Sequence, residues 1–534
     1  MNKQETADLV LMNGVIFTSR DDVPVVQALA IKQGKIIETG SDERMEKHIS
    51  SETKKIDLEG KFACPGFNDA HIHFMGGGLY AKRLNLEKCA SPGEIAQKVK
   101  EKALQLKKGE WILGRGWDQT SFPDKQWPTK DILDSVSPEN PVFLRRVDGH
   151  VAWMNSFALK LAGIDRRTKS PEGGEIAKDA ITGEPTGILK ESAADLVYDL
   201  IPKPSKSDIR EAIEYALNEA KKYGITSIQD NSDAQALAVY EELAKEGKLT
   251  VRVSEWLDYK DDLSECRELK KKYSSSDGMI RFFTLKGYVD GTLGSRTAAM
   301  IEPYTDEPSM KGLLQMPEEK LKALVKRGHE EGFQIALHAI GDCAVREALD
   351  SFEALGVNGR RARNRVEHAQ IINATDLPRF KSLNVIASMQ AIHCISDKKW
   401  AEERIGKERS KGAYAWKSIL SSGAKLCFGT DWPVESMNPL LGLYAAVTRA
   451  SLSEAPQDGW IPEQRITMED ALKCYSTGSA YAEYAEHYKG TLEKGKVADI
   501  VILSKDLLKI NPQEILNTEV TMTIFNGNVV YEKK

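Results

Sequence analysis

The chain has 534 residues, of which 41% are hydrophobic and 29% are charged, the balance of an ordinary globular protein. Its net charge of −5 is small for this length and argues against nucleic acid or an anionic membrane surface as a partner. The sequence contains no apolar stretch long enough to span a bilayer, no signal-peptide pattern and no Cys-x-x-Cys pair among its seven cysteines. These features predict a cytoplasmic protein with reduced thiols that acts on a small molecule.

Both ends of the chain contain short β-type segments separated by dipeptides that suit tight turns, such as Asn13-Gly14 and Gln33-Gly34. These segments are residues 9–17, 28–32 and 35–39 at one end and residues 498–503, 522–525 and 529–531 at the other. Neither set is large enough to form an independent β-domain. We therefore expect residues 1–60 and 486–534 to combine into one small β-sandwich domain.

Between the two ends, apolar strands alternate with amphipathic helices, a pattern typical of parallel β/α architecture. The candidate strands are residues 62–65, 225–229, 251–256, 281–289, 334–337, 365–367, 385–389 and 426–429. Eight such strands predict an α/β fold of the TIM type, a (β/α)8 barrel over residues 61–77 and 191–485, with its chemistry at the carboxyl ends of the strands.

The connection after the first of these strands is too long for a simple βα loop. We interpret residues 78–190 as an inserted subdomain. It contains four of the nine tryptophans, Trp111, Trp117, Trp127 and Trp153. A core for the subdomain is the favoured interpretation of most of them, and an apolar lid over the barrel mouth is the alternative.

The segment 65–73 reads Pro-Gly-Phe-Asn-Asp-Ala-His-Ile-His and follows the apolar residues 62–64. On a strand, residues i and i+2 project from the same face, so His71 and His73 would point at one spot. Two convergent imidazoles suit zinc, although a pair of histidines in a polar pocket has the same spacing.

Polar residues also occur at four later strands. Lys286 lies within an otherwise apolar strand, where a free ammonium is costly unless it reaches solvent. His338 and His368 each follow an apolar run directly, and Asp431 follows the last predicted strand. Since the carboxyl ends of barrel strands meet at one mouth, these residues and the two histidines above are predicted to form one metal site.

The order of these residues resembles that of the metal-dependent amidohydrolase superfamily. Within it, the chain is similar to the YtcJ-like (amidohydrolase-3) branch, which includes N-substituted formamide deformylases. The similar segments are PGFNDAHIHF, ILGRGWDQ, DGHVAWMNSFAL, GEPTGILKE, KGYVDGTLGSRTA, LHAIGD, RVEHAQ and FGTDWPVE, with ADLVLMNGVIFT and GKVADIVILS near the ends. The resemblance therefore extends over essentially the full length.

The resemblance implies a role for each residue of the predicted metal site. It makes His71, His73, His338, His368 and Asp431 metal ligands, with Asp431 also the general acid and base. It implies that Lys286 is a carboxylated lysine that bridges two divalent ions, for which Zn²⁺ is the expected species. One ion beside an unmodified Lys286 is the alternative, and iron or manganese is not excluded.

Other residues lie in motifs that the branch shares. These motifs imply that His150, Arg296, Gln390 and His393 bind substrate, and that Asp230 and Glu191 support the metal-bound imidazoles from behind. A structural hydrogen bond within a loop is the alternative for each of them.

The predicted activity is hydrolysis of a non-peptide C–N bond, in an amide or an N-substituted formamide, by water that the metal activates. Asp431 would accept the proton of that water and return it to the departing nitrogen. An esterase, lactonase, phosphoesterase or deaminase stays open because such a site does not select the leaving group, and so does a non-catalytic binding protein. The substrate, and the choice between monomer and homodimer, stay open as well.

Overall fold

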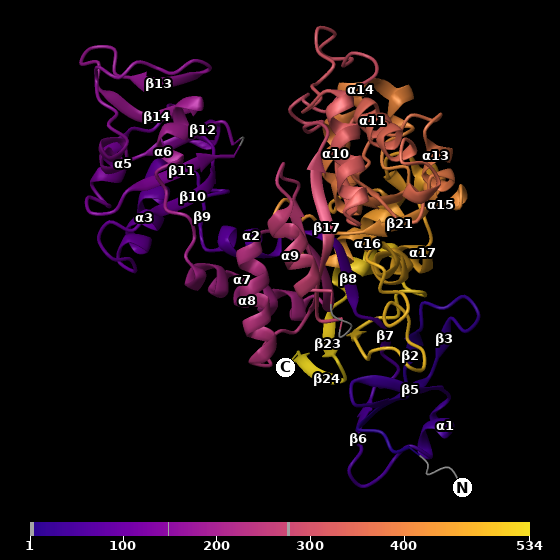
Figure 1. The fold of residues 1–534 in the computed structure, drawn as a ribbon. Helices are drawn as coiled ribbons and strands as arrows, with labels where there is room; N and C mark the ends of the chain where they lie inside the picture. Colours follow the sequence, from indigo (N-terminus) through magenta and orange to yellow (C-terminus); the bar gives the residue numbers. More distant parts are fainter. Residues whose placement is uncertain (1–4, 148, 275–277, 534) are drawn as a thin grey trace. The chain divides into compact units, whose positions relative to one another are not determined.

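The structure is a computed structural model that describes residues 5–147, 149–274 and 278–533 (Figure 1). The chain divides into two compact units, of which the second is Gly78–Ala212 and the first is the rest of the chain. In the described part of the chain, no helix is both long and apolar enough to cross a membrane.

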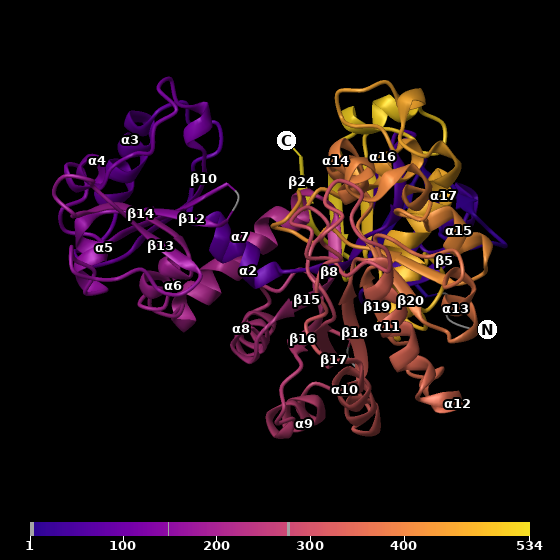
Figure 2. The same cartoon turned by 90° about the horizontal axis from the view of Figure 1, so that it is seen from above.

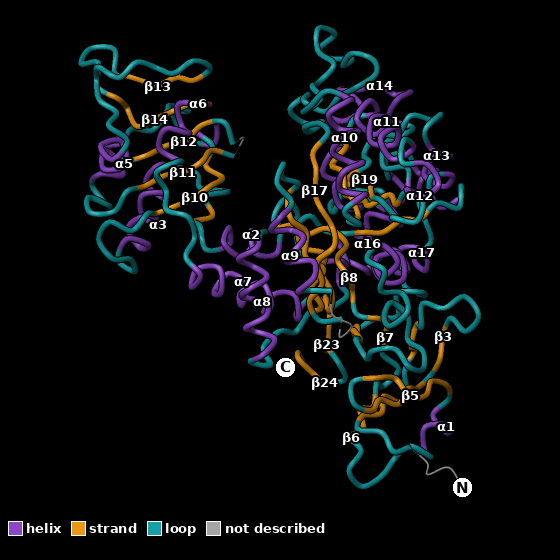
Figure 3. Tube along the Cα trace, in the orientation of Figure 1, coloured by secondary structure: helices purple, strands orange, loops and turns teal. Residues whose placement is uncertain are grey.

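Eight parallel strands in chain order form the barrel of the first unit (Figure 2). They are β8 (Phe67–Ile72), β15 (Ile225–Ser232), β16 (Arg252–Asp258), β17 (Ile280–Tyr288), β18 (Gln334–Ala339), β19 (Arg365–His368), β20 (Ile386–Met389) and β21 (Lys425–Phe428). Their residues are almost all buried, because helices cover the outer face of the sheet (Figure 3). The predicted α/β barrel is confirmed.

Helices follow the barrel strands, and most of them have one buried and one exposed face. They are α7 (Lys206–Lys222), α8 (Ala234–Lys245), α9 (Ser264–Lys272), α10 (Glu318–Glu330), α11 (Asp342–Glu353), α13 (Leu377–Ser382), α14 (Ala391–Ser410), α15 (Trp416–Ser421), α16 (Pro439–Thr448) and α17 (Met468–Lys473). In α8, the Asp233 side chain accepts hydrogen bonds from the first turn, and Leu237, Tyr240 and Leu243 form the buried face. Capping and a 3.6-residue period thus fix where this helix begins and which face it buries.

The barrel closes between β21 and β8 through the backbone just beyond β21. The Asp431 amide donates to the His71 carbonyl oxygen at 2.8 Å, and the His73 amide donates to the Trp432 carbonyl oxygen at 2.9 Å. This approach requires glycine at position 429, where a Cβ atom would lie 2.4 Å from the His71 nitrogen. The strand junction that completes the barrel therefore carries three of the predicted site residues.

The first predicted barrel strand was wrong. Residues Phe62–Pro65 form β7, which pairs with β22 and β2 in a sheet of the chain ends, and the barrel strand β8 begins at Phe67. Between them a Cβ atom on Gly66 would lie 2.3 Å from the Thr226 hydroxyl oxygen, so only glycine permits the change of sheet. Both segments are apolar and buried, and their pattern alone does not separate them.

The two chain ends form two further sheets, as predicted. One has the order β5-β4-β1-β6 and the other β24-β23-β22-β7-β2-β3. Their strands are β1 (Leu9–Met12), β2 (Val15–Phe17), β3 (Val25–Val26), β4 (Ala28–Lys32), β5 (Lys35–Gly40), β6 (Lys54–Asp57), β22 (Ile500–Leu503), β23 (Val520–Phe525) and β24 (Asn528–Glu532). Leu11 and Leu29 share one buried cluster with Ile500 and Ile524, so each end completes the core of the other.

The second unit is built on a mixed sheet with the order β13-β14-β12-β11-β10-β9. Its strands are β9 (Leu84–Asn85), β10 (Ile112–Trp117), β11 (Val142–Arg146), β12 (Val151–Met154), β13 (Gly174–Lys178) and β14 (Pro185–Glu191), and its helices include α3 (Pro92–Ala103), α4 (Lys130–Asp134), α5 (Ser156–Leu161) and α6 (Ser192–Tyr198). Trp117 and Trp153 are buried in its core, with ring centroids 5.9 Å apart. Val197 of α6 is buried in a second cluster of the unit, which places this helix, beyond residue 190, with the insertion.

Replacing Gly429 by alanine is expected to destabilise the barrel, because the new Cβ atom would overlap the His71 backbone. Overpacking of this kind costs about 1–3 kcal/mol, measurable as a lower midpoint of denaturant unfolding. Gly93→Ala in α3 is the control, since its nearest contact would be Ser91 Oγ at 3.8 Å. Equal midpoints for the two variants would contradict the close approach at Gly429.

Candidate metal centre

His71, His73 and Asp431 form one cluster at the junction of β8 and β21. His71 is fully buried at the end of β8, and His73 follows directly. Asp431 Oδ1 lies 3.2 Å from His73 Nε2 and 3.6 Å from His71 Nε2. The ligand atoms of the three side chains all lie within 4.8 Å of one another, the spacing of residues that share a metal ion.

A second cluster contains His368, His393 and the same aspartate. His368 ends β19 and His393 lies in the first turn of α14. Asp431 Oδ2 is 3.7 Å from His393 Nε2 and 4.0 Å from His368 Nδ1, and the three ligand atoms again lie within 4.8 Å of one another. Asp431 therefore joins the two clusters, one oxygen facing each.

The residues fit a divalent cation. Among the described residues, neither Asp431 Oδ1 nor His393 Nε2 has a hydrogen-bond partner, although both atoms are buried. Burial lowers the pKa of His71 to about 4 and the pKa of His368 well below its usual value, so both imidazoles are neutral ligands at pH 7. Burial would raise the pKa of Asp431, but the contact with His73 Nε2 at 3.2 Å and the neighbouring imidazoles lower it, so the carboxylate is anionic. One carboxylate among imidazoles is a donor set that zinc accepts.

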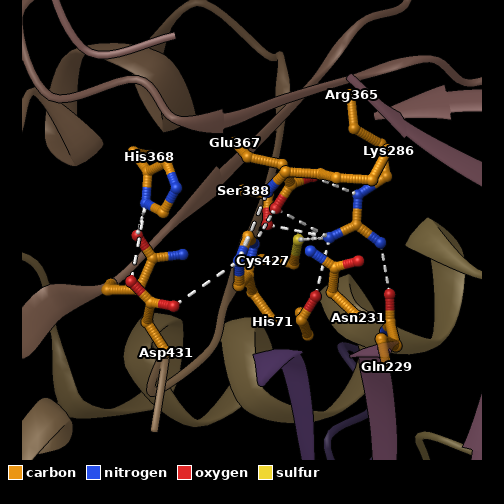
Figure 4. Close-up of polar contacts among 12 residues, drawn as sticks. His71, Gln229, Asn231, Lys286, Arg365, Glu367, His368, Ser388, Cys427 and Asp431 are labelled. Atoms are coloured by element: carbon orange, nitrogen blue, oxygen red, sulfur yellow. Dashed lines mark hydrogen bonds and ion pairs between the residues drawn. The ribbon is translucent and has the colours of Figure 1, made fainter. Parts of the chain in front are cut away.

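A buried ion pair lies behind His71, and the sequence analysis missed it. Glu367 Oε2 accepts a hydrogen bond from His71 Nδ1 at 2.6 Å, and Arg365 Nε donates to Glu367 Oε1 at 2.8 Å (Figure 4). Burial opposes ionisation of Glu367, but Arg365 and His71 hold its pKa at about 2. The carboxylate therefore fixes the tautomer of His71 and directs Nε2 toward Asp431. The sequence did contain an indication of this pair, because Arg365 and Glu367 stand at positions i and i+2 and therefore on one face of the strand.

The Arg365 guanidinium is itself held on all sides. It donates to Gln229, to the Ala70 carbonyl oxygen at 2.8 Å and to Ser388 Oγ at 2.8 Å, and it lies 4.4 Å from the ring centroid of Trp256. Residues of β8, β15, β16, β19 and β20 thus fix one cation inside the barrel. Because Arg365 holds Glu367, the orientation of His71 depends on these contacts.

Comparison with known proteins shows the family of the chain. Residues 54–531 match the model of the Amidohydro_3 family, described as an amidohydrolase family. The chain belongs to this amidohydrolase family. It is 36% identical over 528 residues to YtcJ of Bacillus subtilis (strain 168), covering 97% of this chain and 98% of that protein. The N-substituted formamide deformylase of Arthrobacter pascens is 25% identical over 550 residues, with 98% of each chain covered.

A solved structure shows the same fold. The crystal structure of an uncharacterised metal-dependent hydrolase from Pyrococcus furiosus superposes with a TM-score of 0.78 at 33% identity, covering 94% of this chain and 100% of that chain. The resemblance stated from the sequence is confirmed, and the protein is a metal-dependent hydrolase of the amidohydrolase family.

In this amidohydrolase, Lys286 does not reach solvent. It is 1% exposed in β17, and its Nζ lies 3.5 Å from His71 Nε2. Burial lowers the pKa of the lysine to about 8. The amine therefore lies beside a ligand atom of the first cluster, while carboxylation of Lys286 stays a prediction.

His338 lies next to the second cluster but is not part of it. Its ring centroid is 4.5 Å from that of His368, and its Nε2 donates to the Gly291 carbonyl oxygen at 3.0 Å. That nitrogen is engaged by the backbone, which leaves Nδ1 as the nitrogen able to bind a metal. The role of His338 as a ligand stays a prediction.

Gln390, at the start of α14, and Asp230, in β15, lie beside the clusters. Gln390 Oε1 lies 2.8 Å from His368 Nδ1, and the buried Gln390 Nε2 has no partner in the part of the chain that is described. Asp230 accepts hydrogen bonds from the Phe74 amide at 2.5 Å and from the Tyr240 hydroxyl at 2.7 Å. Asp230 thus holds the backbone that follows His73, and its support of a metal-bound imidazole stays a prediction.

The remaining predicted residues have other partners. Arg296 Nη2 donates to Asp306 Oδ2 at 2.7 Å. His150 Nδ1 lies 3.1 Å from Glu191 Oε2 within the second unit, and both side chains are more than half exposed. Substrate binding by His150, Arg296, Gln390 and His393, and the supporting role of Glu191, stay predictions.

Replacing Glu367 by glutamine is expected to weaken zinc binding about 10- to 100-fold, because a neutral amide no longer fixes the His71 tautomer. The dissociation constant would be measured by competition with a chromogenic chelator. Glu486→Gln is the matched control, since Glu486 pairs with Arg363 at 2.7 Å away from the cluster. Unchanged zinc affinity in a folded Glu367→Gln variant would contradict the positioning role.

Proposed function

We propose that the protein hydrolyses a non-peptide C–N bond in an amide or an N-substituted formamide. The observation that carries the proposal is the position of Asp431, buried between two imidazole clusters with one oxygen free of hydrogen bonds among the described residues. The formamide deformylase among the relatives, aligned over 98% of this chain, supports the same reaction class.

His71 and His73 would hold one divalent ion, and His368 with either His338 or His393 would hold a second, with Asp431 shared between them. A bound ion such as zinc supplies a Lewis acid and lowers the pKa of a water ligand from 15.7 to about 7. Lys286 adds a negative ligand once its amine has combined with carbon dioxide to form a carbamate. A pKa of about 8 favours this step, because a useful fraction of the amine is neutral at pH 7.

Asp431 performs the proton transfers of the proposed reaction. Its Oδ1 atom is buried beside His73 and accepts the proton of the attacking water. The same oxygen returns the proton to the departing nitrogen, which is too basic to leave as an anion. The other oxygen, Oδ2, faces His393 Nε2 at 3.7 Å, on the side of the second cluster.

Replacing Asp431 by asparagine is expected to lower turnover of a formamide such as N-benzylformamide by about 10²- to 10⁴-fold, because the amide cannot accept a proton. Turnover would be measured at saturating zinc, with bound metal determined by elemental analysis of the same sample. The loss should be smaller for a matched activated ester, whose alkoxide leaves without protonation. Near wild-type amide turnover with metal bound would overturn the assignment.

Replacing Lys286 by methionine is expected to reduce bound zinc from two ions per chain to one or none, since methionine keeps the side-chain length but forms no carbamate. Elemental analysis gives the stoichiometry, and ¹³C NMR of protein equilibrated with ¹³C-bicarbonate detects the carbamate carbon. One ion per chain and no carbamate signal in the unmodified protein would contradict the bridging role of Lys286.

A further inference from the structure

The second unit contains a pocket of its own, with a volume of about 370 Å³. Three arginines line it, Arg83, Arg115 and Arg145, against one acidic residue, Asp195. All of its lining residues lie within Gly78–Ala212, so the pocket belongs entirely to this unit. Its volume falls within the usual range of 300–1,000 Å³ for small-molecule sites.

The placement of two of these arginines is unfavourable in the absence of a ligand. Arg115 of β10 and Arg145 of β11 are direct partners in the parallel ladder, so like charges lie side by side on one face of the sheet. In the residues that the structure describes, Arg83, Arg115 and Arg145 form no ion pair with a carboxylate within 4 Å. The next residue, Arg146, by contrast, pairs with Asp118 at 2.6 Å. Asp118 therefore neutralises Arg146 beside the pocket, whereas the arginines that line the pocket are available to an anionic ligand.

Aromatic rings and the backbone hold the arginines in position. The Arg145 guanidinium lies 5.4 Å from the ring centroid of Phe143 and 5.1 Å from that of Tyr198, and it donates to the Gly149 carbonyl oxygen at 3.0 Å. The Arg115 guanidinium lies 5.9 Å from the ring centroid of Tyr80. A guanidinium stacked on rings keeps its N–H edges for hydrogen bonding, and those edges match a carboxylate in bidentate geometry.

We propose that this pocket binds the carboxylate of a small organic acid whose body is aromatic or branched and apolar. Arg115 and Arg145 take the carboxylate, and Leu113 with the rings of Phe143 and Tyr198 receives the apolar body. Asp195 limits the net positive charge of the pocket, which favours a monoanion over a multiply charged phosphate. The site stands apart from the proposed hydrolysis, since none of its residues belongs to the metal clusters.

The test is isothermal titration of the metal-loaded protein with phenylacetate, its neutral analogue phenylacetamide and inorganic phosphate. Phenylacetate is expected to bind at this site, phenylacetamide to bind at least tenfold more weakly, and phosphate more weakly than phenylacetate. Arg115→Gln and Arg145→Gln should each weaken phenylacetate binding about 10- to 100-fold. Arg167→Gln, an exposed arginine of the same unit paired with Asp165, is the matched control and should change nothing.

Thermal unfolding separates a binding role from a structural one. Without ligand, Arg115→Gln and Arg145→Gln should match or exceed the melting temperature of the unmodified protein, because each removes a repulsion. Phenylacetate should raise the melting temperature of the unmodified protein and of Arg167→Gln, but not of the two pocket variants.

Four results would overturn the proposal. Equal binding of phenylacetate to the unmodified protein and both pocket variants would place that binding elsewhere, the metal centre included. Equal binding of phenylacetamide would remove the role of charge, and tighter binding of phosphate with the same dependence on Arg115 and Arg145 would assign the pocket to phosphate groups. A lower melting temperature for both ligand-free variants would make the arginines structural.

Discussion

The closure of the barrel between β21 and β8 is the constraint on which the metal centre depends. The amides of Asp431 and His73 make the hydrogen bonds that join these strands, so the closure itself sets the separation of their side chains. Asp69 strengthens the junction by accepting from the Thr430 amide at 2.9 Å and from its hydroxyl group. Asp431 adopts a φ of 57°, a left-handed conformation that costs energy outside glycine and persists because the junction enforces it. Completion of the barrel therefore sets the geometry of the candidate metal centre.

The buried ion pair of Arg365 and Glu367 is explained by its effect on His71 and not by a contribution to stability. Two fully buried charges cost desolvation energy that their attraction often fails to recover, and apolar residues of similar size would serve stability as well. What apolar residues cannot do is accept the Nδ1 proton of His71 at 2.6 Å and leave Nε2 for a metal. The surrounding donors and acceptors keep the pair in one geometry, which a ligand imidazole inside a barrel requires.

The sequence predicted those parts of the site that depend on strand ends, and not those that depend on register or on the packing of a helix. His71, His368 and Asp431 were predictable because parallel strands bring their carboxyl ends to one mouth. The choice of β8 over β7 as the first barrel strand was not predictable, because two consecutive apolar segments give the same pattern whichever sheet they join. The position of His393 beside Asp431 depends on how the first turn of α14 packs, and the pairing of Arg115 with Arg145 depends on one ladder register among several.

The buried polar atoms around Asp431 differ from those of the Arg365 guanidinium and its partners. Around Arg365 the side chains of the barrel interior satisfy one another with hydrogen bonds, whereas in the described residues Asp431 Oδ1, His393 Nε2 and Gln390 Nε2 have no partner. These three atoms lie around the carboxylate that joins the two clusters. Other buried side-chain atoms of the described residues, such as Trp256 Nε1 and Ser254 Oγ, also have no partner, so an unpaired atom alone does not mark a site. An unpaired buried polar atom costs about 1–3 kcal/mol, and a metal ion bound at the two clusters would offset that cost for Asp431 Oδ1 and His393 Nε2. The candidate centre is therefore distinguished by unpaired atoms that coincide with ligand geometry.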